Sequence, residues 1–228
     1  MSGENQLKNG NVDEAIAYAR QCMEQKLMPE LRYHNLTHTF EHVMPAALEL
    51  ADLCGVSQEE KQLLMVAVAF HDTGWIFKGH GHERISAALA RKKLPALGFS
   101  KRQVDRITSM ILATQMPHQP TCLLDSILID ADMAILSRDD FWLCNDELRA
   151  ELELLGEPLS DSEWYESQLA FLEKHRYFTN VAIAGREQAK QKHILELHQR
   201  LEACYAEAER PLNGHTPIES LVKSESDG

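Results

Sequence analysis

The sequence predicts an all-α protein, a single helical bundle whose buried central helix ends in a His-Asp pair. Apolar residues recur at helical spacing through nearly the whole chain, and no period-two alternation is sustained. Gly and Pro cluster between these segments instead of within them. The 228 residues suffice for one large domain with its own core. We therefore expect one domain over 11–209, with mobile ends at 1–10 and 210–228.

Helical periodicity and capping signals divide the chain into segments. The helix predicted over 57–70 ends in the continuous apolar run Leu63–Phe70, so this helix is expected at the centre of the core. Pro45 lies inside 36–53 and should either bend that helix or mark its entry turn. Ser100 and Gln103 have the spacing of a capping box. The predicted helices are 12–28, 36–53, 57–70, 83–93, 101–115, 122–136, 139–154, 161–175 and 180–208.

The charge and cysteine content narrow the choice of partners and compartment. The chain has 23 Lys and Arg against 35 Asp and Glu, a net charge of −12. Nucleic acids and anionic membranes both attract basic surfaces, so we expect neither as a partner. Five scattered cysteines without a CxxC pair indicate a reducing compartment. With a polar N-terminus and no apolar run longer than Leu63–Phe70, we expect a cytoplasmic protein. The sequence is compatible with both a monomer and a homodimer.

The most informative stretch is AFHDTGW, in which His71 and Asp72 follow eight apolar residues. Charged groups at the end of a core helix cost several kcal/mol unless they are paired or bound to a metal. Asp132 raises the same question, because it lies in the apolar stretch LIDADMAIL, and His38 lies upstream in YHNLTH. Imidazoles combined with carboxylates suit magnesium or a divalent first-row metal, in contrast to a thiolate zinc site.

The order His, His-Asp, Asp on an all-α chain resembles the HD-domain superfamily of metal-dependent phosphohydrolases. YHNLTH (Tyr33–His38) is similar to the metal-site motif of the cyclic-nucleotide phosphodiesterases, which belong to that superfamily. HERISAALA (His82–Ala90) is similar to the segment that follows the HD pair in small bacterial members. The resemblance implies one or two divalent metal ions (Mn, Mg, Fe, Co, Ni or Zn). The implied ligands are His38, His71, Asp72 and Asp132.

The resemblance also implies a reaction, the hydrolysis of a phosphoester or phosphoanhydride in a small molecule, with a nucleotide as the leading candidate. Asp72 would be the ligand able to bridge two metals, and a metal-bound water would be the nucleophile. His34 would give a proton to the leaving group, although it also fits a polar residue at a helix start. Asp130 competes with Asp132 as a ligand. The family pattern favours Asp132, which leaves Asp130 behind the ligands or at the surface.

Basic residues near the HD pair are candidates for substrate binding. The segment KGHGHERIS concentrates positive charge just after the HD pair. It is either a phosphate-binding element or a solvated loop. FLEKHRYFT, nearer the C-terminus, is either close to the cleft or a solvated helix end. The candidate substrate-binding residues are Lys78, His82, Arg84, His118 and Arg176.

Two other functions stay open at this point. A di-iron oxygenase of the same fold would recruit His80 or His82, together with His118, as additional ligands. A catalytically silent nucleotide-binding regulatory module would be expected to have lost a ligand, so the complete set argues against it.

Overall fold

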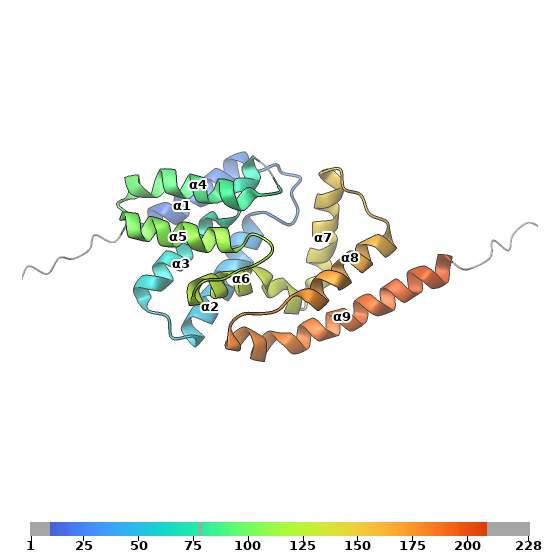
Figure 1. The fold of residues 1–228 in the computed structure, drawn as a ribbon. Helices are drawn as coiled ribbons and strands as arrows, with labels where there is room; N and C mark the ends of the chain where they lie inside the picture. Colours follow the sequence, from blue (N-terminus) through green and yellow to red (C-terminus); the bar gives the residue numbers. More distant parts are fainter. Residues whose placement is uncertain (1–9, 78, 209–228) are drawn as a thin grey trace, which may run out of the picture.

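The computed structural model describes residues 10–77 and 79–208, and all regular structure in these residues is helical (Figure 1). The all-α prediction is therefore confirmed. The longer helices are α1 (Val12–Lys26), α2 (Met44–Leu53), α3 (Gln58–His71), α4 (His82–Lys93), α5 (Lys101–Ala113), α6 (Leu123–Asp132), α7 (Phe141–Leu154), α8 (Asp161–Lys174) and α9 (Asn180–Ala208). The short π or 3-10 helices are η1 (Thr37–Val43), η2 (Thr73–Ile76), η3 (Leu94–Leu97) and η4 (Met133–Ser137).

Two predicted helices are each divided in the structure. The segment 36–53 consists of the π-helix η1 followed by α2, and Pro45 lies in the first turn of α2. Proline fits there because its missing N–H would have no partner in the first turn. The segment 122–136 consists of α6 followed by the 3-10 helix η4. These irregular turns lie beside His38 and Asp132, and π turns are frequent at functional sites.

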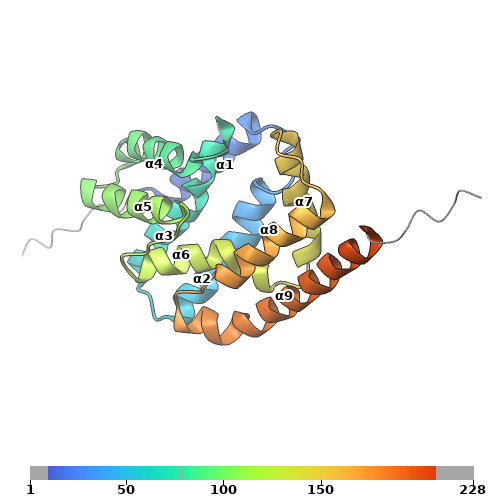
Figure 2. The same cartoon turned by 45° about the vertical axis from the view of Figure 1, so that its right-hand side comes forward.

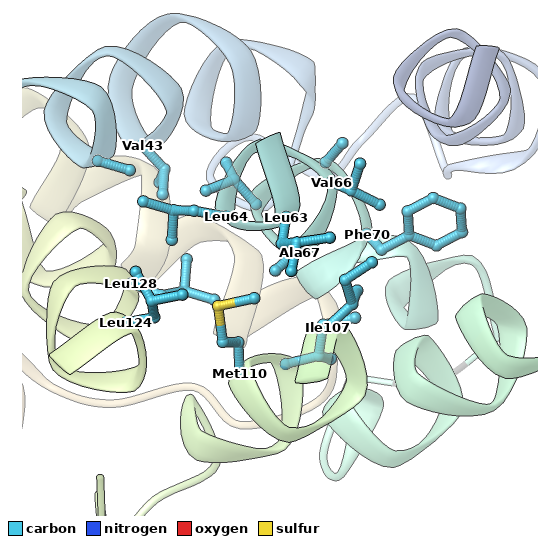
Figure 3. Close-up of a cluster of buried hydrophobic side chains, with 14 of the residues drawn as sticks. Val43, Leu63, Leu64, Val66, Ala67, Phe70, Ile107, Met110, Leu124 and Leu128 are labelled. Atoms are coloured by element: carbon cyan, nitrogen blue, oxygen red, sulfur yellow. The ribbon is translucent and has the colours of Figure 1, made fainter. Parts of the chain in front are cut away.

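Helix α3 lies at the centre of the main core, as expected from its apolar run Leu63–Phe70. Leu64 and every residue from Val66 to Phe70 are completely buried. Helices α1, α2, α4, α5 and α6 surround α3. Figure 3 shows Met110 of α5 and Leu128 of α6 beside this helix. The end of α3, where the His-Asp pair lies, is therefore held in place by the core.

Helices α7, α8 and α9 belong to a second, smaller core. Both views show α8 lying along α9, on the far side of the molecule from α4 (Figures 1 and 2). The buried residues of this smaller core are Leu136, Phe141, Leu169, Leu172, Ile194 and Leu197. They come from η4 and the three C-terminal helices, so η4 connects this core to the end of α6.

Local capping supports the helix boundaries. The Ser100 side chain accepts from the backbone N–H of Gln103, and the Gln103 side chain accepts from the backbone N–H of Ser100. The predicted capping box is thus complete. No helix among the described residues is long and apolar enough to cross a membrane.

Candidate metal centre

The predicted ligands come together from separate elements of the main core. His38 lies in η1, His71 is the last residue of α3, and Asp132 is the last residue of α6. Their ligand atoms all lie within 4.8 Å of one another. The Nε2 atom of His38 is 3.0 Å from the Oδ1 atom of Asp132, and the Nε2 atom of His71 is 3.5 Å from it. Residues far apart in the sequence thus form one cluster.

Asp72, the C-cap of α3, completes this cluster. Its Oδ2 atom lies 3.4 Å from Nε2 of His38 and 3.2 Å from Nε2 of His71. Neither Oδ2 of Asp72 nor Nε2 of His71 has a hydrogen-bond partner among the described residues, although both are buried. Buried polar atoms normally have hydrogen-bond partners. Two buried atoms that lack one, and that can both coordinate a metal, therefore need an explanation. The imidazole and carboxylate donors fit a divalent metal.

The imidazole of His71 is held in the tautomer that a ligand needs. Its Nδ1 atom lies 2.7 Å from the carbonyl oxygen of Val68. Because a carbonyl only accepts, Nδ1 must carry a proton, and Nε2 is then the ring nitrogen that faces the cluster and can bind a metal in exchange for its own proton. Metal-bound histidines usually make such a bond through the other ring nitrogen.

The charges in the cluster stabilise one another. Burial acts to lower the pKa of His71, but the nearby carboxylates of Asp72 and Asp132 together outweigh it and raise the pKa well above its ordinary value. Burial acts to raise the pKa of Asp72, but His71 holds that pKa well below its ordinary value. The pKa of Asp132 is also lowered, against burial, by its hydrogen bond with His38 and by the nearby imidazole of His71. Both carboxylates are therefore ionised near neutral pH.

His82, predicted as a substrate-binding residue, lies on the other side of Asp72. Its Nε2 atom is 3.1 Å from Oδ1 of Asp72, while its Nδ1 atom is 2.8 Å from the carbonyl of Gly79. A Cβ atom on Gly74 would lie 2.1 Å from the His82 carbonyl oxygen, so only glycine allows this approach. The N–H of Gly74 donates to Ser86 Oγ at 2.8 Å. The HDTGW and HERIS motifs thus pack together, and Asp72 has imidazoles at both oxygens.

The carboxylate of Glu151, which was not predicted from the sequence, binds His34. Glu151 of α7 is buried, and its Oε1 atom contacts Nδ1 of His34. Its Oε2 atom accepts from the backbone N–H groups of Tyr33, at 3.1 Å, and His34, at 3.0 Å. Burial acts to raise the pKa of Glu151, but its bonds with His34 lower it. One signal was available in the sequence, since Glu151 occupies the apolar face of α7 that carries Phe141 and Cys144.

The competing carboxylate, Asp130, has a different role. It is completely buried, which contradicts a surface position. Its carboxylate accepts from the N–H of Phe178 at 2.9 Å and of Thr179 at 2.8 Å, and from the Thr179 hydroxyl at 2.7 Å. Arg186 donates to the Asp130 backbone carbonyl at 2.6 Å. Asp130 therefore ties the start of α9 to α6, and its oxygens are already occupied.

This difference between the two carboxylates can be tested by a matched pair of variants. We expect Asp130→Asn to lower the free energy of unfolding by about 2 kcal/mol, because an amide replaces a carboxylate that accepts three hydrogen bonds. Metal content per folded protein should stay unchanged. Asp132→Asn should lose bound metal instead. Chemical denaturation and metal analysis of both variants check the pair, and metal loss in Asp130→Asn at unchanged stability would contradict the assignment.

The basic segment after the HD pair is mostly turned to solvent. Lys78 lies outside the described residues. His80 is exposed, and its Nε2 atom is 2.8 Å from Oε1 of Glu157. Arg84 is exposed too, and its Nε donates to Gln115 at 3.4 Å. His80 and Arg84 make these contacts away from the metal cluster.

The other two substrate-binding candidates lie in different places. His118 is half-buried in the loop before α6, with its ring centroid 6.4 Å from that of Phe178. Burial lowers the pKa of His118, and the negative charge of Asp132 opposes this shift. Arg176 lines a separate cavity of about 540 Å³ at the α8–α9 junction, together with Glu187. No predicted metal ligand lines that cavity.

Comparison with known proteins agrees with this geometry. Residues 37–134 match the family model described as HD domain. The chain therefore contains an HD domain over residues 37–134. A crystal structure of a predicted HD superfamily hydrolase from an uncultured Thermotogales bacterium has a similar fold, with a TM-score of 0.54 at 21% sequence identity. The alignment covers 88% of this chain and 96% of the other chain. A search of curated proteins found no match.

The HD domain match contains every predicted metal ligand and His82, but it excludes two other residues of the site. His34 precedes the matched region, and Glu151 follows it. The metal cluster therefore belongs to the part of the chain that defines the family. The paired imidazole and carboxylate beside it come from the flanking segments.

Proposed function

We propose that this HD protein is a metal-dependent phosphohydrolase, which cleaves a phosphoester or phosphoanhydride in a small molecule. The observation that carries the proposal is the buried carboxylate of Asp72, with His38 and His71 at one oxygen and His82 at the other. The similar Thermotogales structure is described as a predicted hydrolase, which supports the same reaction class.

The site supplies the parts that hydrolysis needs. His38, His71, Asp72 and Asp132 would hold a divalent metal, which when bound lowers the pKa of water and neutralises phosphoryl charge. The Asp132 side chain is 15% exposed, against 1% for His71, so substrate approaches from the side of Asp132. His82, with Nε2 3.1 Å from Oδ1 of Asp72, would help to hold a second ion if one were bound.

His34 is the proton donor that we propose for the leaving group. Nδ1 of His34 is bound to Glu151, and no described residue forms a hydrogen bond with its Nε2 atom. The His34 side chain is 18% exposed, so Nε2 can be reached by a ligand. A carboxylate behind one ring nitrogen orients the imidazole, so that the other nitrogen can face a ligand. His34 is therefore the general acid in this proposal, and a departing alkoxide receives its proton.

A nucleotide is the substrate class we favour, since the superfamily members with the YHNxxH motif act on nucleotides. His118 and Arg84 are the remaining candidates for contacts to it. Specificity depends on the shape of the pocket, and a panel of nucleotides and simple phosphoesters identifies the substrate directly.

The oxygenase alternative has less support from the positions of the histidines. His80, one of its candidate ligands, is exposed and bound to Glu157. His82 does reach Asp72, but an additional imidazole there serves a binuclear hydrolase equally well. Oxygen uptake by iron-loaded protein would favour the oxygenase over the hydrolase.

The proposed function predicts a strict dependence on metal. Treatment with a chelator should reduce turnover of the best panel substrate to background, and one of Mn, Mg, Fe, Co, Ni or Zn should restore it. Because metal should bind only to the folded cluster, reloading should also raise the unfolding temperature. Activity that persists in metal-free protein, or a loaded protein that cleaves nothing in the panel, would contradict the proposal.

A further inference from the structure

The general acid proposed above lies flat against an indole ring. The rings of His34 and Trp75 are stacked, with centroids 3.9 Å apart and an angle of 19° between their planes. Trp75 lies in η2, three residues after Asp72. The backbone N–H of Trp75 donates to the backbone carbonyl of Asp72 at 3.0 Å. The segment that carries the bridging carboxylate thus also carries the surface on which His34 rests.

Trp75 itself is fixed from several sides. A Cβ atom on Gly79 would lie 2.8 Å from the indole ring, so glycine allows the backbone to approach the ring closely. The ring centroid of His82 is 5.1 Å away. The indole Nε1 atom is buried and has no hydrogen-bond partner among the described residues. Packing therefore holds the indole without help from a bond through its N–H.

The stack supplies a constraint that Glu151 cannot provide alone. A hydrogen bond through Nδ1 fixes the direction of one ring nitrogen of His34, but the ring can still turn about that bond. A flat aromatic surface at contact distance removes this rotation, because tilting the imidazole would break the stack. The two contacts together fix the plane of the ring, and so the direction of Nε2.

We propose that Trp75 is a positioning residue, which aims Nε2 of His34 at the leaving group through the stacking contact. Trp75 also contacts a protonated imidazole favourably, because the face of an aromatic ring attracts a cation. This inference rests on the proposed function, in which His34 is the general acid. A proton donor out of alignment by about 1 Å can cost about 100-fold in rate.

The test compares Trp75→Leu, which removes the aromatic face, with Trp75→Phe, which keeps it and removes the N–H. We expect Trp75→Leu to lower kcat about 10- to 100-fold for a substrate with an alkoxide leaving group, with KM and metal content little changed. Turnover of p-nitrophenyl phosphate should change less than threefold, because nitrophenolate leaves without a proton. Trp75→Phe should restore most of the lost rate. Phe77→Leu, which removes an aromatic ring that is 64% exposed two residues further along, is the matched control and should leave both rates unchanged.

A double-mutant cycle decides whether Trp75 acts through His34. In a His34→Ala background, Trp75→Leu should have no further effect on kcat. An equal loss of kcat in Trp75→Leu for both kinds of leaving group would overturn the inference. So would a double variant in which the losses of kcat from Trp75→Leu and His34→Ala multiply. A Trp75→Phe variant as slow as Trp75→Leu would also overturn it, since the N–H and not the stack would then be required.

A measurement on metal-free protein separates this inference from the function on which it rests. The ring current of Trp75 should shift the imidazole proton resonances of His34 upfield, and these are assigned by their absence in His34→Ala. Trp75→Leu should remove the shift, and Trp75→Phe should retain part of it. If the wild-type protein cleaves nothing but the shift is present, the proposed function fails while the stack stands. Unshifted His34 resonances would overturn the inference whatever the activity.

Discussion

Asp72→Ala is expected to abolish both bound metal and hydrolysis. Its carboxylate lies near three imidazoles of the centre, those of His38, His71 and His82, at 3.4, 3.2 and 3.1 Å. Loss of a residue behind a ligand typically costs about 10- to 100-fold in metal affinity, and loss of a shared ligand should cost more. Metal analysis of the purified variant and turnover of the best substrate measure the two effects.

Asp139→Ala is a suitable control, because Asp139 is an exposed carboxylate in the turn before α7. It should leave metal content and turnover at the wild-type level. A circular dichroism spectrum separates loss of metal from loss of fold. Full metal stoichiometry in Asp72→Ala would show that this residue is not a ligand.

His34→Ala is expected to leave metal bound while lowering turnover about 10²- to 10⁴-fold for a poor leaving group, the usual contribution of a general acid. The metal should stay because none of the measured contacts of the cluster depends on the His34 ring. The variant should keep most of its activity toward a nitrophenyl ester, whose leaving group needs no proton. Steady-state kinetics with both substrates and metal analysis test the expectation.

His42→Ala provides the comparison within the same stretch of chain. His42 continues the four-residue spacing of His34 and His38, yet it is only half-buried. Burial lowers its pKa, and the charge of Arg138 lowers it further. It should be replaceable without loss of rate. If His34→Ala turned over an alkyl ester at the wild-type rate, His34 would be a structural residue and the acid would have to lie elsewhere.

The fold and the ligand cluster could be predicted because both depend on patterns that lie within short stretches of sequence. The apolar run Leu63–Phe70 predicts burial of the C-terminal part of α3, and the structure shows it. His71 and Asp72 must then emerge from the core, where charges require a partner. The family resemblance adds His38 and Asp132. Their proximity, within 4.8 Å for His38, His71 and Asp132, then follows from how the helices pack.

What could not be predicted depends on contacts between residues far apart in the chain. Glu151 binds His34 from 117 positions away, and nothing in the local sequence of either residue indicates its partner. Asp130 has the same apolar neighbours as Asp132, but its direction along α6 turns it toward Thr179. A single pattern such as DAD cannot show which of its two carboxylates faces the cluster.

The basic segment shows the opposite limitation. Lys78, His80, His82 and Arg84 are close in sequence and suggested one patch of positive charge. In the structure His82 begins α4 and turns toward Asp72, while His80 and Arg84 face solvent. Neighbours in a loop and the first turn of a helix point in different directions, so proximity in sequence did not indicate a shared surface.

The two cores of the molecule have a consequence for how its chemistry could fail. The proposed metal ligands all extend from the main core, whereas Glu151 belongs to α7, which packs in the smaller one. Loosening of the smaller core would withdraw the carboxylate from His34 while the ligand cluster remained assembled. On heating, the protein should therefore first become selective for substrates with good leaving groups, and only later release its metal. Its catalytic repertoire would narrow before its structure was lost.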